Sequence, residues 1–294
     1  PWPSAFHAFL NSPGFTDHHI ALFLTSCVEQ ARHLLESQDP PRINNWLMME
    51  MNGLYTVGAV FPELKEAEEW RSYALKTLHT AQQRQFLPDG AQFELTSSYH
   101  NVSLKNIFNT IRLARVTGRL SEVPEEMMQD LEKSWDFNLY MMAPDGSMPP
   151  LNDSGNTSVT RSMKDALEIF PEREEYRWAA SRGEIGKCPQ KTSVFFNHAG
   201  YAVMRTGWDS KSTALYVDVG PPGASHIHQD KLNLVLWAHG REILFDSGGG
   251  MYDDSVFREY GVESFSHNTV LVDGLGQHRA MDPEHRGPVK SDWS

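Results

Sequence analysis

The hydrophobic pattern of the first part of the chain has the period of a helix. Between about residues 17 and 183, apolar positions recur every three or four residues, and capping or turn residues separate the segments. The segment over 46–61 is apolar nearly all round, which predicts an inner, buried helix. The expected helices cover residues 17–34, 46–61, 62–78, 98–117, 125–142, 162–169 and 174–180.

After about residue 183 the hydrophobic period changes to two, as in half-buried strands. Paired helices of alternating inner and outer character favour an α/α toroid, so we predict an α+β chain with two domains, residues 1–184 and 185–294. Because the sequence stops at Ser294 within a strand-like region, we expect the second domain to be incomplete. The expected strands cover residues 193–196, 201–205, 213–219, 232–237, 243–245 and 269–272.

Composition narrows the range of partners. The apolar share of 40% and the charged share of 22% are those of an ordinary globular protein. A formal charge of −12 argues against a nucleic-acid partner, and an acidic polysaccharide would need a locally basic cleft. No apolar run is long enough to predict a membrane span. The chain opens on Pro1-Trp2-Pro3 with no Met and no signal peptide, which we interpret as a processed or excised piece.

The two cysteines, Cys27 and Cys188, lie far apart in the sequence. They could form one disulfide or remain as two reduced, buried thiols, and the sequence leaves both alternatives open.

A histidine-rich run carries the strongest chemical signal. His226, His228 and Asp230 alternate along the chain, so they would share one face if this run were extended. Asp246 ends the second of two following strands, and His267 precedes another. Each residue alone is more often a satisfied side chain at a strand end. Together, neutral imidazoles and a carboxylate are a usual ligand set for zinc.

Three further polar segments precede this run. Asn45 and Trp46 stand at the entrance of the most apolar helix, where an Asn is often only an N-cap. Tyr99 and His100 open another helix, where a Tyr more often packs. The third, Leu151-Asn-Asp153, follows two prolines and is a polar loop of weak specificity.

Taken in order, these residues resemble the heparinase II/III superfamily of polysaccharide lyases. The resemblance runs from about residue 40 to 273 and rests on five motifs. They are Asn45-Trp46, Tyr99-His100, His226-x-His228-x-Asp230, Gly240-Arg-Glu-Ile-Leu-Phe-Asp-Ser-Gly248 and His267-Asn-Thr-Val270. It implies an incomplete α/α toroid followed by an antiparallel β-sandwich. It also implies cleavage of a uronic-acid polysaccharide, such as a glycosaminoglycan or an alginate-like polymer, by β-elimination to 4,5-unsaturated products (EC 4.2.2.-).

The resemblance implies that Asn45, Tyr99 and His226 are catalytic. Removing the C5 proton of a uronate requires its carboxylate charge to be neutralised, and an amide such as Asn45 can donate that hydrogen bond. Tyr99 and His226 would remove the proton and protonate the leaving oxygen. Which is the base depends on the C5 epimer, which the sequence leaves open. The expected substrate-binding wall consists of Trp46, Glu94, His100 and Tyr252.

By the same resemblance, His228, Asp246 and His267 would hold a mainly structural zinc ion. Trp46 stands where some members have a His, which favours a heparinase III-like site over an oligoalginate-lyase-like one. A periplasmic or secreted location and an acidic polysaccharide partner follow from the family. The sequence does not indicate an oligomeric state.

Two other function classes stay open. An inverting glycoside hydrolase on the same toroid would need two cleft carboxylates, for which Glu50, Glu94 and Asp153 are available. A non-catalytic sugar-binding or cupin-like metal protein is the other. Leu232 and Asn233 stand where the cupin metal motif needs a Glu, which weakens that interpretation.

Overall fold

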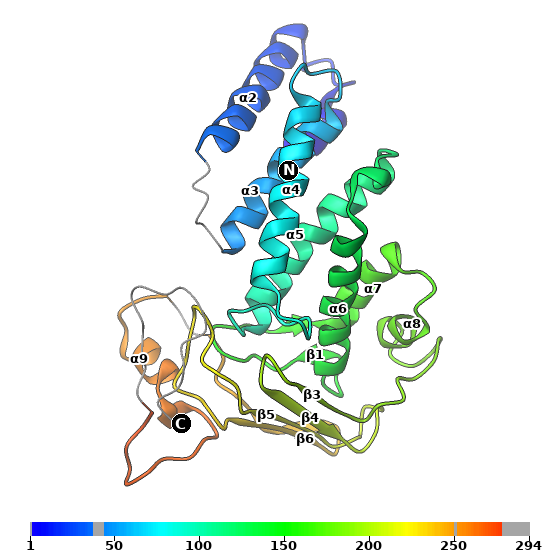
Figure 1. Ribbon diagram of the computed structural model, residues 1–294. Helices are drawn as coiled ribbons and strands as arrows, with labels where there is room; N and C mark the ends of the chain where they lie inside the picture. Colours follow the sequence, from blue (N-terminus) through cyan, green and yellow to red (C-terminus); the bar gives the residue numbers. More distant parts are fainter. Residues whose placement is uncertain (1, 38–43, 250–251, 278–294) are drawn as a thin grey trace. The chain divides into compact units, whose positions relative to one another are not determined.

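A computed structural model describes residues 2–37, 44–249 and 252–277 (Figure 1). The chain divides into two compact units, Pro1–Arg84 with Lys105–Met128, and Gln85–Leu104 with Gln129–Ser294. Each is described by itself. The predicted boundary at residue 184 follows the change from helices to strands, whereas the second compact unit contains both helices and strands.

The first unit is helical and is built around α3 (Asn45–Val60). Nine residues of α3 are buried, which confirms the predicted inner helix. The side chain of Asn44 caps it by accepting a hydrogen bond from the Leu47 N–H at 3.1 Å. The other elements are α1 (Trp2–Phe9), α2 (Asp17–Glu36), α4 (Ala67–Gln85), η1 (Leu120–Glu122) and the later part of α5 (Ser97–Val116).

The prediction that Pro62 opens the fourth helix was wrong. Residues 62–66 form turns, in which the Leu64 N–H donates to Phe61 O and the Ala67 N–H donates to Leu64 O. The helix begins only at Ala67. Glu68 and Glu69, rather than the glutamates before them, occupy its first turn, where the helix dipole favours negative charge.

The second unit combines helices with an antiparallel sheet. Its helices include the start of α5, most of α6 (Glu125–Met141), α7 (Val159–Ile169) and α8 (Glu174–Ala180), close to the predicted spans. The five strands pair in chain order: β3 (Ser193–Phe196), β4 (Tyr201–Arg205), β5 (Ala214–Asp218), β6 (Leu234–Ala238) and β7 (Arg241–Leu244). A short pair, β1 (Ser147–Met148) with β2 (Thr157–Ser158), lies beside them.

One face of the sheet is buried and the other is open. Val203, Tyr216 and Val235 stand opposite one another in register and are at most 2% exposed. From this face, Tyr216 and Arg205 donate hydrogen bonds to backbone oxygens at the end of α6, which lies above the sheet in Figure 1. The opposite face carries apolar side chains that remain accessible, among them Phe195, Met204, Leu215 and Leu236.

The histidine-rich run is not extended, and one predicted strand is absent. Residues 226–230 form a loop, because His226 has a φ of 60°, in the left-handed region that interrupts an extended chain. The predicted strand at 269–272 makes only an isolated bridge, between Val272 and Leu275. The elements α9 (Val256–Val262) and η2 (Ser264–Ser266) precede this bridge.

Both cysteines are free thiols, so the disulfide alternative does not hold. Cys27 is buried as the other alternative expects, but Cys188 is exposed. Within the described ranges, no helix is long and apolar enough to cross a membrane.

Candidate active site

Three loops of the second unit meet around the histidine-rich run. The Ala224 N–H donates to Phe93 O at 3.2 Å, and the His228 N–H donates to the Asn152 side chain at 2.9 Å. Gly223 passes so close to the chain at Glu94 that a Cβ there would lie 2.0 Å from the Glu94 carbonyl oxygen. A side chain at position 223 would therefore push these loops apart, and glycine lets them approach.

Tyr99 and His226, two of the three predicted catalytic residues, are in direct contact. Their rings stack with centroids 3.9 Å apart and planes 12° apart. The start of α5 supplies Tyr99, whose N–H donates to the Thr96 hydroxyl at 3.0 Å. His226 keeps 23% of its side chain exposed. A stacked phenol and imidazole at an accessible position can exchange protons with a bound sugar.

Tyr252, which was expected only in the binding wall, joins this pair. Its hydroxyl lies 3.0 Å from the Tyr99 hydroxyl and 3.2 Å from His226 Nδ1. Burial raises the pKa of Tyr252, and the hydrogen bond with Tyr99 and the charge of Asp153 raise it further. Tyr252 therefore keeps its proton at neutral pH and can donate or relay it.

Glu94 lies on the other side of the His226 ring. Its Oε2 is 3.6 Å from His226 Nε2, and its Oε1 accepts a hydrogen bond from the Gln92 amide at 3.1 Å. Only 3% of its surface is exposed. Burial raises the pKa of Glu94, although the Gln92 hydrogen bond and the nearby His226 oppose that shift. Glu94 is thus buried against His226, and its predicted contact with the sugar stays a prediction.

Asp153 also contacts the histidine-rich run, and Arg258 contacts Asp153. The sequence indicated Asp153 only as a loop residue and as a candidate carboxylate of the hydrolase alternative. Asp153 Oδ2 lies 3.0 Å from His226 Nδ1, and its Oδ1 lies 2.9 Å from His228 Nε2. Arg258, on α9, donates to both carboxylate oxygens. Burial alone would raise the pKa of Asp153, but these hydrogen bonds hold it well below its usual range. Nothing in the sequence linked Asp153 to the histidines, and nothing indicated Arg258.

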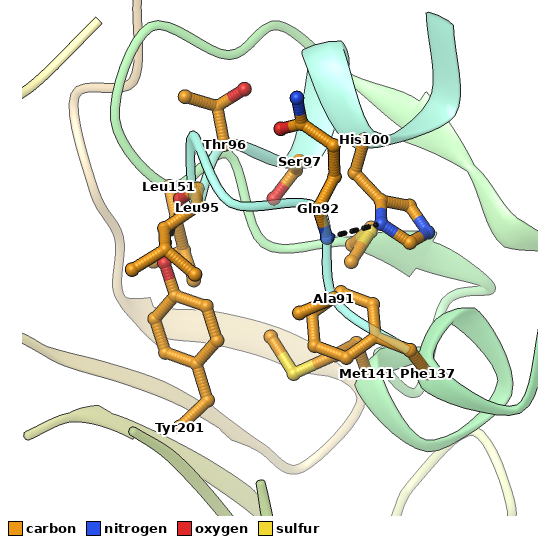
Figure 2. A pocket seen from close by; sticks show the side chains of 11 residues that line it. Ala91, Gln92, Leu95, Thr96, Ser97, His100, Phe137, Met141, Leu151 and Tyr201 are labelled. Atoms are coloured by element: carbon orange, nitrogen blue, oxygen red, sulfur yellow. Dashed lines mark hydrogen bonds between the residues drawn. The ribbon is translucent and has the colours of Figure 1, made fainter. Parts of the chain in front are cut away.

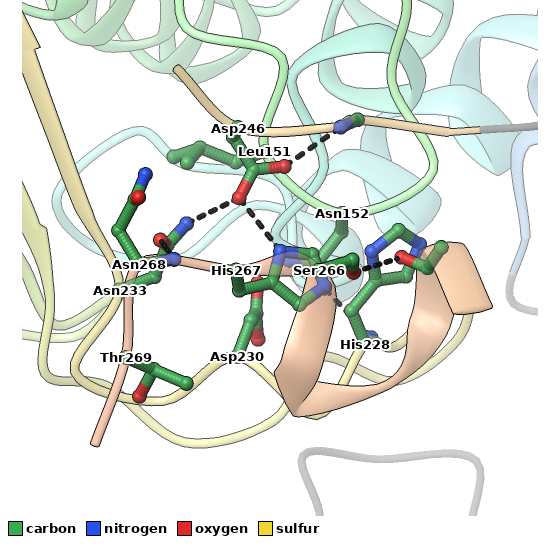
Figure 3. Close-up of polar contacts among 12 residues, drawn as sticks. Leu151, Asn152, His228, Asp230, Asn233, Asp246, Ser266, His267, Asn268 and Thr269 are labelled. Atoms are coloured by element: carbon green, nitrogen blue, oxygen red, sulfur yellow. Dashed lines mark hydrogen bonds and ion pairs between the residues drawn. The ribbon is translucent and has the colours of Figure 1, made fainter. Parts of the chain in front are cut away.

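The predicted metal ligands lie close together and are buried (Figure 3). The rings of His228 and His267 are 5.1 Å apart. His267 Nδ1 lies 2.7 Å from Asp246 Oδ2, which also accepts a hydrogen bond from Asn233 at 2.5 Å. The other Asp246 oxygen accepts from the Gly248 N–H at 2.7 Å. Asp246 thus orients His267 in this arrangement.

The two histidines of this cluster have free nitrogens that suit a metal ion. His228 Nδ1 and His267 Nε2 are buried without a hydrogen-bond partner, while the opposite nitrogen of each ring contacts a carboxylate. Metal-binding histidines usually have such a carboxylate partner. In the part of the chain that the structure describes, however, no three His, Cys, Asp or Glu side chains are arranged to hold one ion.

Asn45 and Trp46 belong to the first unit. Asn45 is the first residue of α3 and is 8% exposed, whereas the Trp46 side chain is 59% exposed. Trp46 is therefore not a core residue. The proximity of Asn45 to Tyr99 and His226 stays a prediction.

His100 lines a small interior pocket with Gln92 and Phe137 (Figure 2). It is 1% exposed, and its Nδ1 accepts a hydrogen bond from the Gln92 N–H at 3.2 Å. Burial lowers the pKa of His100 to about 3, so the ring is neutral. These contacts favour a structural role, and the predicted contact of His100 with substrate stays a prediction.

We expect His100 to make the fold sensitive to acid. Its pKa of about 3 in the folded state lies below the value of about 6.5 in an unfolded chain, so the unfolded state binds the extra proton. The contribution of His100 to the free energy of unfolding should be complete above about pH 6.5. It should fall as pH decreases towards 3, by about 2 kcal/mol at pH 5. Urea unfolding at pH 7 and pH 5 measures this. His100→Gln should lose that part of the dependence, whereas the exposed His18→Gln should keep it; equal pH dependence in all three proteins would contradict the prediction.

Comparison with known proteins identifies the family. Residues 2–178 match the heparinase II/III N-terminus, and residues 189–290 match the heparinase II/III-like C-terminal family. The heparin-sulfate lyase of Bacteroides stercoris is 29% identical over 276 residues, which cover 92% of this chain and 41% of that protein. The corresponding enzyme of Pedobacter heparinus is 28% identical over 278 residues, covering 92% and 42%.

Solved structures agree with these sequence matches. A heparinase III gene product aligns with a TM-score of 0.85 at 29% identity, over 92% of this chain and 43% of that chain. A mutant of the heparan sulfate lyase HepC from Pedobacter heparinus gives 0.83 at 27% identity, over 94% and 44%. The chain spans less than half of the length of these relatives. The likeness confirms the predicted fold class, a toroid-type helical region with an antiparallel β-sandwich region. On the two matches, which together cover most of its residues, the chain belongs to the heparinase II/III family.

Proposed function

We propose that this protein is a polysaccharide lyase that cleaves a uronic-acid-containing glycosaminoglycan of the heparan sulfate type by β-elimination. The observation that carries the proposal is the contact of Tyr99 with His226, completed by the Tyr252 hydroxyl. The relatives named heparin-sulfate lyases favour a glycosaminoglycan over an alginate-like polymer. A polymer of this class is extracellular, which agrees with the expected periplasmic or secreted location.

The reaction needs one proton removed and one delivered. A base takes the C5 proton of the uronate, the C4–O bond breaks, a C4–C5 double bond forms, and an acid protonates the departing oxygen. The Tyr99 hydroxyl and the His226 ring are the groups for these two steps. The Tyr252 hydroxyl contacts both groups.

The proposal includes Asn45 as the donor to the uronate carboxylate. Neutralising that charge stabilises the enolate-like transition state, and removing a comparable donor costs about 10²–10³-fold in kcat. The exposed Trp46 ring would face a sugar, since an aromatic surface can stack on the apolar side of a pyranose. Glu94 and His100 would complete the wall by holding the loops in place.

The hydrolase alternative has less support. Glu94 and Asp153 do lie on either side of His226, with pKa values raised and lowered, respectively. However, both Asp153 oxygens already accept hydrogen bonds from Arg258 and the two imidazoles, and Glu94 Oε2 is covered. Neither carboxylate is free to activate a water against a sugar.

The product distinguishes these functions. Purified protein is incubated with heparan sulfate, chondroitin sulfate, hyaluronan and alginate, and both ultraviolet absorbance and new reducing ends are followed. A lyase produces both signals in equal amounts, because only elimination creates the conjugated double bond. Reducing ends without absorbance would indicate a hydrolase, and neither signal with any polymer would contradict the proposal.

We also propose that His228, Asp246 and His267 hold a structural zinc ion. Two buried imidazole nitrogens without partners support the two histidine ligands, and Asp246 lies 2.7 Å from His267 Nδ1. When bound, the ion would link the loop at 226–230 to the segment after η2, and its chemistry would be structural.

Elemental analysis of protein purified without chelator should find about one zinc per chain. Chelation should lower the Tm, because metal bound only by the folded state stabilises it. His267→Gln should abolish the metal and remove the response to chelator. Metal-free protein whose Tm is unaffected by added zinc would rule the site out.

A further inference from the structure

The loop that carries His226 and His228 does not orient their side chains by itself. On an extended strand, residues two apart point to the same side. Here His226 has a φ of 60°, so that regularity is lost between the two histidines. Something outside the loop must fix where the two rings point.

A single carboxylate contacts both rings. Asp153 Oδ2 lies 3.0 Å from His226 Nδ1, and Asp153 Oδ1 lies 2.9 Å from His228 Nε2. The loop and Asp153 are also tied through the backbone, because the Asp153 N–H donates to His226 O at 3.4 Å. The neighbouring Asn152 accepts the His228 N–H at 2.9 Å. The short segment at 152–153 therefore holds the loop at four points.

We propose that Asp153 is a positioning residue that sets the orientation and the protonated nitrogen of His226 and His228 together. The role at His226 rests on the proposed lyase function, whereas the role at His228 does not. An ionised carboxylate only accepts hydrogen bonds, so each contacting nitrogen must carry the hydrogen. His228 is then protonated on Nε2, and its buried Nδ1 keeps a free lone pair. His226 is protonated on Nδ1, beside the Tyr252 hydroxyl.

Arg258 offsets the cost of burying the Asp153 carboxylate. Asp153 is 4% exposed, and an unpaired buried carboxylate would be costly. The two guanidinium nitrogens of Arg258 contact the two Asp153 oxygens, a paired geometry that fixes the carboxylate plane. The rings of Tyr99 and Tyr252 pack against two further sides of His226. One ion pair thus orients both the catalytic imidazole and the imidazole of the candidate metal site.

Asp153→Asn keeps the shape of the side chain and removes its charge. We expect kcat on heparan sulfate to fall by about 10²-fold, since losing the carboxylate behind a working imidazole costs between about 10-fold and 10⁴-fold. KM should change little, because the Asp153 side chain is buried. Asp209→Asn, an exposed carboxylate of the same unit, is the matched control and should behave as wild type.

Nitrogen NMR of the histidine rings provides a readout that does not depend on activity. In the wild-type protein, His228 should carry its hydrogen on Nε2 and His226 should carry one on Nδ1. Asp153→Asn should change both patterns, and the control should change neither. Hydrogen on His228 Nδ1 in the wild type, or unchanged rings in Asp153→Asn, would overturn the proposal. If the wild type shows no lyase activity but has these ring patterns, the proposed function fails while the positioning role at His228 stands.

The single variant could also unfold, because it leaves Arg258 without its partner. Asp153→Asn combined with Arg258→Met removes the unpaired cation as well. If the double variant folds and retains near-normal kcat, Asp153 does not position His226 and the proposal is wrong. If it folds and remains about 10²-fold slower, with altered ring signals, the proposal is supported. If both variants fail to fold, the wild-type NMR pattern still tests the proposal, because hydrogen on His228 Nδ1 would overturn it.

Discussion

Tyr99→Phe should abolish most turnover while leaving the protein folded. The substitution removes one hydroxyl, the group that lies 3.0 Å from the Tyr252 hydroxyl, and keeps the ring that stacks on His226. Loss of a proton-transferring side chain typically costs about 10²–10⁴-fold, so we expect kcat to fall within that range. The measurement is the initial rate of ultraviolet absorbance on heparan sulfate, with circular dichroism to verify the fold.

Tyr260→Phe is the matched control for this experiment. Tyr260 is 56% exposed, and its hydroxyl makes only a 3.4 Å contact with Phe265 O. Its loss should therefore change neither kcat nor stability. Near-normal release of unsaturated product by Tyr99→Phe would remove Tyr99 from the mechanism, and most of the lyase proposal with it.

Lys231→Met should produce the largest loss of stability. Lys231 Nζ lies 2.5 Å from Asp218 Oδ2 and 3.7 Å from Asp230 Oδ1, and both carboxylates are at most 2% exposed. Removing the cation leaves two buried negative charges. Breaking a buried ion pair costs about 3–5 kcal/mol, and we expect the free energy of unfolding to fall by that amount. Urea unfolding of both proteins measures the difference.

The loss should also depend on pH. Burial raises the pKa of Asp218 to about 6 even though Lys231 opposes the shift. Protonation can therefore neutralise Asp218 in the variant at low pH, so the deficit should be larger at pH 8 than at pH 5. Replacing Asp218 by Asn in the same protein should recover part of the stability. The exposed Lys211→Met is the control; a deficit no greater than that of the control would contradict the buried-pair interpretation.

The sequence was most informative where a repeating pattern and packing agree. The period-3.6 pattern over α3, α5 and α6 and the period-two pattern over β3, β4 and β5 predicted those elements closely, because each buries one set of side chains. The run at 226–230 is not extended, for a physical reason. Its alternating His and Asp residues have the spacing of a strand, but the left-handed backbone at His226 is set by contacts with distant loops.

The same reason explains why the contact of Asp153 with His226 and Arg258 was not predicted. Asp153 precedes His226 by 73 positions, and Arg258 follows Asp153 by 105. No local spacing connects residues that far apart, so only the folded chain brings the three together. Tyr99 and His226 were identified because a family resemblance already joined them. Tyr252 was expected only in the binding wall, and its contact with both depends on a loop whose course the sequence does not specify.

The open face of the sheet has a practical consequence for all of these experiments. Phe195 is 57% exposed and Met204 is 45% exposed, on a flat surface that continues over Leu215 and Leu236. Surfaces of this kind promote association between molecules. The purified chain should therefore self-associate as its concentration rises, and light scattering by the associated molecules would distort absorbance assays. Rates and unfolding midpoints should be measured over a dilution series, and a Met204→Lys background would keep the samples dispersed without touching the site.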